Sequence, residues 1–164
     1  MNPFERDVLG HLDAQIESAR RLLGSILGQG HAIRERDVDN VLARLADIKT
    51  EMDLRARLEG ERTDLLVRAG AQLGVPAAAV TLEAMTGLMD AAVAERARER
   101  SAELRGLLDE VTREHGINRA LMRQELAFLD HLVRLLAREP EIGYRPNGPA
   151  APTASQHHVL NLQA

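Results

Sequence analysis

The six histidines of this 164-residue chain are the side chains best suited to binding a metal or accepting a phosphoryl group. Asp7 and His11 lie four residues apart, on one face of a predicted helix, but no second pair at a fixed spacing completes a metal site. His157 and His158 would bind a metal only weakly. We therefore expect neither a metal nor another cofactor.

Catalysis is not expected from the remaining reactive side chains. Phosphotransfer on a helical bundle would need a lysine beside the reactive histidine, and His31, His115 and His131 have no such lysine. The serines of the predicted helices have no histidine placed to activate them. The run from Gly28 to Gly30 follows no predicted strand and lacks the full glycine pattern of a phosphate-binding loop. It indicates the end of a helix instead.

The composition favours an all-helical fold. Apolar residues make up 45% of the chain but aromatic residues only 2%, whereas a sheet would need more β-branched and aromatic side chains. The net charge of −4 argues against a nucleic-acid partner, and the absence of cysteine excludes disulfides and thiol catalysis. No run of about 18 apolar residues could cross a membrane, and no signal peptide precedes the first helix. We expect a cytoplasmic protein.

Turn residues and apolar spacing predict four helices, over residues 4–27, 37–73, 81–89 and from just after residue 90 to residue 138. In the last of these, glutamates and arginines three apart between Glu95 and Arg105 indicate a solvated face with local ion pairs. The expected fold is an elongated antiparallel helical bundle, or coiled-coil-like hairpin, with a long C-terminal helix. Residues 1–139 would form the helical domain and residues 140–164 a flexible tail.

The second predicted helix carries a heptad-like apolar seam, which predicts packing along another helix. Its members are Val38, Val41, Leu45, Ile48 and Met52.

The segment 118–138 has two apolar stripes where a surface helix of a bundle needs only one. The first stripe comprises Met122, Leu126, Leu129, Val133 and Leu136. The second comprises Leu121, Phe128, Leu132 and Leu135, roughly 110° around the helix. Glu125 lies between the two stripes. Towards the N-terminus, the first stripe continues through Leu104, Leu108 and Val111, and its next two positions are occupied by His115 and Asn118.

Three interpretations of the two stripes remain open from the sequence. The helix could be central to a bundle that buries both, it could offer one stripe to the amphipathic helix of another protein, or it could pair with a second copy of the chain. A polar residue in an apolar seam, such as Asn118, is typical of a position that sets the register of packing.

Several short motifs occur in an order that resembles the FlgN-type flagellar export chaperones over nearly the full length of the chain. They are a leucine-rich first helix, Glu35-Arg36-Asp37 before Val41-Leu42, Lys49 and Arg62, Thr81-Leu82, the run 118–122 before Phe128-Leu129, Tyr144 with Gly148, and the ending 159–164. The chain departs from the family at His115, where a second asparagine is usual, and at Asn161 and Gln163, where an acid and a lysine are usual.

The resemblance implies a chaperone without catalytic activity that holds the hook–filament junction proteins, hook-associated proteins 1 and 3, before their secretion. The family binds the C-terminal amphipathic helix of these clients with its own C-terminal region and docks on the cytoplasmic domain of the export gate. When the client-binding region of the family is placed on this sequence, the candidate client-binding residues are Asn118, Leu121, Glu125, Phe128, Leu132 and Leu135. Tyr144 is the candidate for docking on the export gate.

Two other classes of function remain as alternatives. The chain could be a homodimeric coiled-coil scaffold, in which the second stripe pairs with itself. It could also be a small helical signalling bundle.

Overall fold

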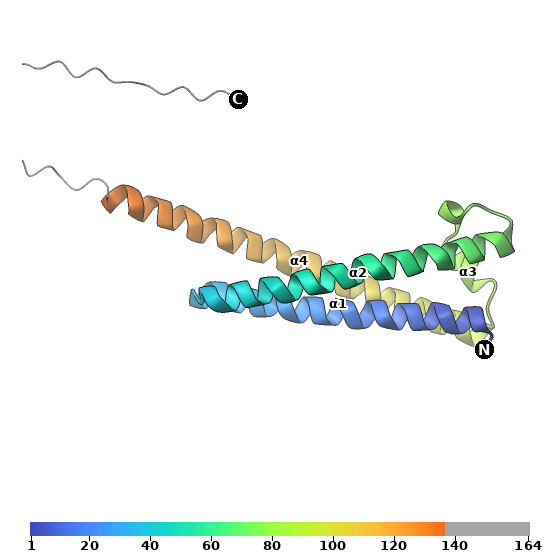
Figure 1. Ribbon diagram of the computed structural model, residues 1–164. Coiled ribbons are helices and arrows are strands. Elements are labelled where there is room, and N and C mark those ends of the chain that lie inside the picture. Colours follow the sequence, from blue (N-terminus) through green and yellow to red (C-terminus); the bar gives the residue numbers. More distant parts are fainter. Residues whose placement is uncertain (137–164) are drawn as a thin grey trace, which may run out of the picture.

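A computed structural model describes residues 1–136, which form three long helices and two short ones (Figure 1). Helix α1 spans Pro3–Glu35, α2 spans Val38–Leu73 and α4 spans Ala91–Leu136. The connection from α2 to α4 contains η1 (Ala77–Ala79) and α3 (Leu82–Thr86). These elements confirm the expected all-helical fold with a long C-terminal helix. The predicted tail, residues 140–164, lies outside the described residues.

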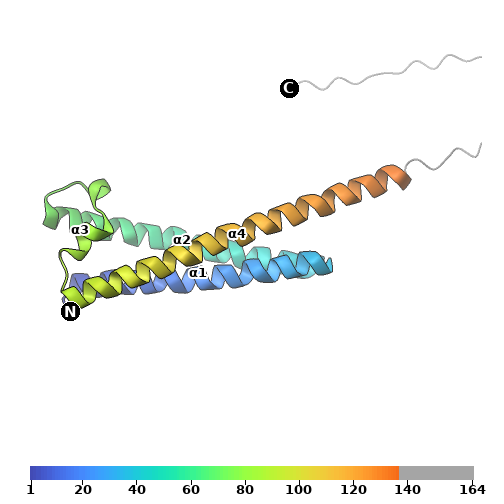
Figure 2. The ribbon, with the colours of Figure 1, turned by 180° about the vertical axis from the view of Figure 1, so that it is seen from behind.

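Helix α1 is the central element of the bundle. It packs along both α2 and α4, whereas α2 and α4 form no comparable interface with each other within residues 1–136. Helices α1 and α2 form an antiparallel hairpin, and α4 runs back beside α1 in the same direction as α1 (Figures 1 and 2). The short elements η1 and α3 lie at the end of the molecule that also holds the N-terminus.

The prediction that the first helix ends at Gly28 to Gly30 is wrong, because α1 continues for another turn and a half to Glu35. A helical glycine costs about 1 kcal/mol relative to alanine, but here the missing side chain allows a close approach of α4. A Cβ atom built on Gly30 would lie 2.4 Å from Oδ1 of Asn118. Tertiary packing therefore outweighs the local preference.

The bounds of α2 follow the sequence signals. Asp37 caps its first turn by accepting a hydrogen bond from the backbone N–H of Asn40 at 3.0 Å. Gly74 ends the helix with a φ of 70°, and its N–H bonds the carbonyl of Gly70. A Cβ on Gly70 would meet the carbonyl oxygen of Val75 at 2.6 Å, so this turn needs glycine at two positions.

Two clusters of the hydrophobic core lie at the N-terminal end of α1, and buried apolar residues continue along this helix through Ile16 and Ile26 to Ile33. One cluster joins Phe4 and Val8 to Leu65 and Ala69 of α2 and to Met85 of α3. A second cluster joins Leu9 to two residues of α4, Val93 and Ala97. The alanines at these crossings let the helices approach closely, so buried apolar contacts join α1 to α2, α3 and α4 at this end of the bundle.

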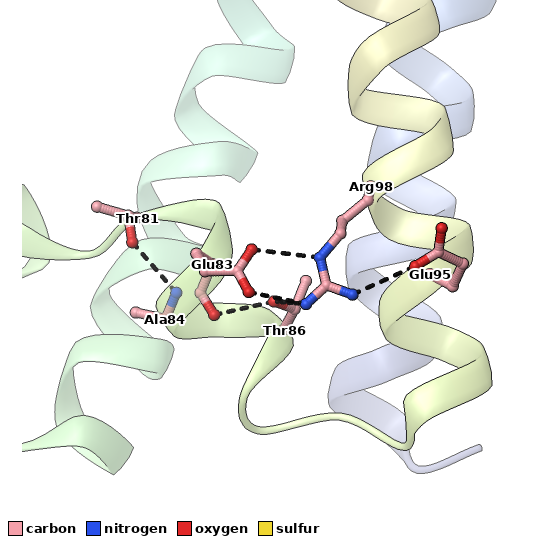
Figure 3. Close-up of polar contacts among 6 residues, drawn as sticks. All are labelled: Thr81, Glu83, Ala84, Thr86, Glu95 and Arg98. Atoms are coloured by element: carbon pink, nitrogen blue, oxygen red, sulfur yellow. Dashed lines mark hydrogen bonds and ion pairs between the residues drawn. The ribbon is translucent and has the colours of Figure 1, made fainter.

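Arg98, in the first turns of α4, binds two side chains of α3 (Figure 3). Its Nη2 and Nε donate to the carboxylate of Glu83 at 2.8 and 3.2 Å, and Nη2 also donates to the Thr86 hydroxyl at 3.1 Å. Thr81 caps α3 by accepting from the N–H of Ala84. The expected pair of Glu95 with Arg98 is present at 3.4 Å, but the guanidinium is held mainly by α3.

The charged face between Glu95 and Arg105 is less solvated than expected. Arg100 pairs with Asp13, and Glu103 pairs with Arg20, both across the interface with α1. These two ion pairs therefore connect α4 to α1, whereas the pair of Glu95 with Arg98 lies within α4.

Glu5 is a buried carboxylate that joins the starts of α1 and α4. It completes a capping box, accepting from the N–H of Asn2 at 2.6 Å while the Asn2 side chain accepts from the N–H of Glu5. Its other oxygen accepts from the N–H of Asp90 at 2.8 Å. These backbone donors, Asp90 first, hold the pKa of Glu5 below its ordinary value.

A lowered pKa in the folded state makes the Glu5 carboxylate stabilising above its unfolded pKa, and this contribution is lost as the pH falls through the folded pKa. We expect Glu5→Gln to be less stable than the parent chain at about pH 7, with the difference shrinking towards about pH 3. Urea unfolding over this range measures it. A difference that stays constant with pH would contradict the proposed role of the ionised carboxylate.

Candidate functional site

The distal part of α4 extends beyond the other helices. Helix α4 has 46 residues and α1 has 33, and the two start at the same end of the molecule. At 1.5 Å per residue, α4 exceeds α1 by about 20 Å. Figures 1 and 2 both show the last turns of α4 passing the tip of the α1–α2 hairpin. We call residues 126–136 the overhang.

The overhang exposes large apolar side chains on more than one side. Every residue from 126 to 136 is exposed. Its large apolar members are Leu126, Phe128, Leu129, Leu132, Val133, Leu135 and Leu136. Such a contiguous apolar surface is uncommon on a monomer and marks a site of interaction.

Both predicted stripes belong to this exposed surface. The interpretation that a bundle buries both stripes is wrong for the overhang, because the described neighbours reach only its start, at Leu126, Phe128 and Leu129, and all of its residues remain exposed. The first stripe is covered only in part at Met122, while Leu126 and Val133 are 66% and 63% exposed. In the second stripe, Leu121 is half-buried, and Phe128, Leu132 and Leu135 are 45%, 37% and 52% exposed.

Asn118 lies inside the bundle and not on the client-facing surface predicted for it. It is 1% exposed, and its Nδ2 donates to the carbonyl of Ile26 at 2.7 Å and to Oε1 of Gln29 at 3.3 Å. A client cannot reach this side chain while α1 and α4 are packed together. Its contacts agree instead with the register-setting interpretation of a polar residue in a seam.

Arg36 links the tip of the hairpin to α4. It ends α1 in a left-handed conformation with a φ of 57°, and its Nε lies 3.3 Å from the Glu125 carboxylate. Its guanidinium also lies 5.6 Å from the centre of the Phe128 ring, a cation–π distance. Two predicted site residues, Glu125 and Phe128, are thus brought together by a residue that the sequence analysis did not assign to the site.

An apolar groove opens between the hairpin tip and α4. Its walls are Ile33, Val38 and Val41 on one side and Met122, Leu126 and Leu129 on the other, with Arg36 and Glu125 at its edge. The groove is therefore continuous with the overhang. It adds side chains from α1 and α2 to a surface that the sequence had placed on the last helix alone.

The apolar seam of α2 is also largely uncovered. Val38, Leu45 and Met52 are 66%, 52% and 52% exposed, and Val41 and Ile48 are half-buried. The prediction that this seam packs along another helix is met only in part within residues 1–136, because α2 packs along α1 but three of the five seam residues remain exposed. The heptad spacing was a usable signal of a binding surface, because a seam without an internal partner is available to an external one.

Two further observations concern metal ligands and membrane-spanning segments in the described part of the chain. Within residues 1–136, no three side chains of the histidine, aspartate and glutamate types are grouped as metal ligands would be. None of the helices in this range has an apolar stretch that would reach across a membrane. Tyr144, the candidate for docking, lies outside the described residues.

Comparison with known proteins adds one finding to this geometry. The family model described as FlgN protein matches residues 1–152. No curated protein and no solved structure matches the chain.

Proposed function

Because this chain belongs to the FlgN family and is a flagellar export chaperone, we propose that its clients are the hook–filament junction proteins, hook-associated proteins 1 and 3. It binds the C-terminal amphipathic helix of each client in the cytoplasm, keeps the client unpolymerised and delivers it to the export gate.

The observation that carries this proposal is the exposed apolar overhang of α4. An amphipathic helix buries its apolar face when it lies against such a surface, and apolar burial is worth about 25 cal/mol per Å². Leu121, Phe128, Leu132 and Leu135 remain the proposed client-facing residues, with Glu125 at their edge. Asn118 is left out because it is buried.

The bundle at the other end gives the overhang a stable base. The cluster of Leu9 with Val93 and Ala97 and the buried bonds of Asn118 hold α4 against α1, so the overhang continues a helix that is anchored in the bundle. Release then requires only that the client helix leaves an open surface. Tyr144 is proposed, from the family resemblance alone, to dock on the cytoplasmic domain of the export gate.

Titration calorimetry with purified hook-associated proteins 1 and 3 tests the proposal. We expect each full-length protein to bind, and a form that lacks its C-terminal helix to lose about 100-fold or more in affinity, because that helix supplies the buried apolar face. Equal affinity for the full-length and shortened clients, or no binding by either, would contradict the proposed function.

A further inference from the structure

We propose that the client helix does not lie on the overhang alone but enters an open slot between α2 and α4, where a carboxylate of the client binds Arg55. This inference rests on the proposed function and deepens it. The α2–α4 slot is floored by α1, because α1 packs on both flanking helices while those two do not pack extensively on each other in the described range. The molecule thus resembles a four-helix bundle that lacks its fourth long helix.

The two ends of the slot are visible as separate grooves lined by the same face of α2. Val38 and Val41 line the groove at the hairpin tip, and Arg55, Glu59 and Arg62 line a second groove nearer to α3. Val41, Arg55 and Arg62 are separated by multiples of seven, which returns a helix to nearly the same face. The exposed seam residues Leu45 and Met52 lie on α2 between the two ends.

Helix α4 supplies the opposite wall in the same way. Leu104 and Leu108 line the groove near α3, and Met122, Leu126 and Leu129 line the groove at the tip. The tip groove leads directly into the overhang. From Arg55 to Val38, α2 covers about 25 Å, which is about the length of a helix of five turns.

The chemistry near α3 indicates what the occupant must carry. The Nη1 atom of Arg55 is buried and has no hydrogen-bond partner in the described part of the chain. Arg62 is already paired with Glu59 at 3.2 Å, whereas neither Arg55 nor Arg105 has a carboxylate within 4.0 Å among residues 1–136. Arg55 lines this groove without a carboxylate partner among the described residues, so a client helix gains affinity by placing an aspartate or glutamate where the Arg55 side chain can rotate to meet it.

The test compares Arg55→Glu with Arg57→Glu, which makes the same change of charge on the far side of α2, about 160° around the helix, at an exposed position. We expect Arg55→Glu to weaken binding of hook-associated proteins 1 and 3 by about 10- to 100-fold in calorimetry. Arg57→Glu should bind within about twofold of the parent chain and keep its unfolding midpoint. Arg55→Glu should unfold cooperatively at a slightly lower denaturant concentration, because its carboxylate lies four residues from Glu59. Replacing the responsible client carboxylate by arginine restores binding to Arg55→Glu.

A second measurement does not depend on the charge change. The chain has no cysteine, so Met52→Cys introduces a single thiol into the slot and Arg57→Cys a single control thiol outside it. With client at about ten times its dissociation constant, we expect maleimide to react about tenfold more slowly with Met52→Cys, while Arg57→Cys reacts at an unchanged rate.

Each other outcome overturns the inference in a distinguishable way. If the parent chain binds its clients but Arg55→Glu behaves like Arg57→Glu and Met52→Cys stays reactive, the slot is not the client site, and the proposed function stands. A Met52 thiol that is already protected in the chain alone points to residues 137–164 as the occupant, and protection that grows with protein concentration points to a second copy. No binding of either client removes both the inference and the proposed function.

Discussion

Replacing Leu132 by aspartate is expected to abolish client binding while the bundle stays folded. Burying one leucine side chain is worth about 2 kcal/mol, and an ionised carboxylate in the same contact is strongly unfavourable. The affinity for hook-associated proteins 1 and 3 should therefore fall by at least about 100-fold. Leu132 belongs to the overhang, away from the core clusters, so the helical circular dichroism and the unfolding midpoint should change little.

Ala127→Asp is the matched control, because it adds the same charge to the overhang on the polar side, about 140° around α4 from Leu132. Its affinity should stay within about threefold of the parent chain. If Leu132→Asp instead unfolds the protein, the second stripe is part of the internal core. If both variants bind normally, clients contact a different surface.

Replacing Gly30 by alanine is expected to cause the largest loss of stability of any single methyl addition in α1. The new Cβ would lie 2.4 Å from the Asn118 side chain, whose amide is held by Ile26 and Gln29. Either α4 moves away from α1 or Asn118 rotates and leaves buried polar groups without partners. Each costs about 1–3 kcal/mol in the free energy of unfolding, more than the helix propensity of alanine returns.

Gly24→Ala provides the control, because a Cβ at that position of the same helix meets no atom within 4 Å. There the propensity of alanine acts alone and should stabilise the chain by up to about 1 kcal/mol. The two substitutions are thus expected to have opposite signs in denaturant unfolding. Stabilisation by both would show that α4 does not approach α1 as closely as Asn118 indicates.

The sequence was sufficient for the helices and for most of their ends. Asp37 and Thr81 cap α2 and α3 at the predicted starts of these helices, and α2 ends at Gly74 as predicted. Such signals are local, because caps and turns satisfy backbone groups within a few residues.

The surplus of apolar surface was also determined by the sequence, through the two stripes of the last helix and the seam of α2. Which of these surfaces is covered could not be determined in that way, since burial depends on how far the neighbouring helices reach. Only the structure shows that α4 extends beyond the end of α1 and so leaves Leu126 and Val133 exposed. It also shows that no long helix covers Met52 in the described range.

The placement of polar residues was decided by tertiary structure for the same reason. The position of Asn118 in the sequence fits both an accessible site residue and a residue of a packed seam. Only its hydrogen bond to the carbonyl of Ile26 shows that it belongs to the seam. Likewise, the local cost of Gly30 favoured a helix end, and the close approach of α4 outweighed it. Periodicity determines which side chains share a face of a helix, whereas the packing of whole helices decides whether that face is core or binding surface.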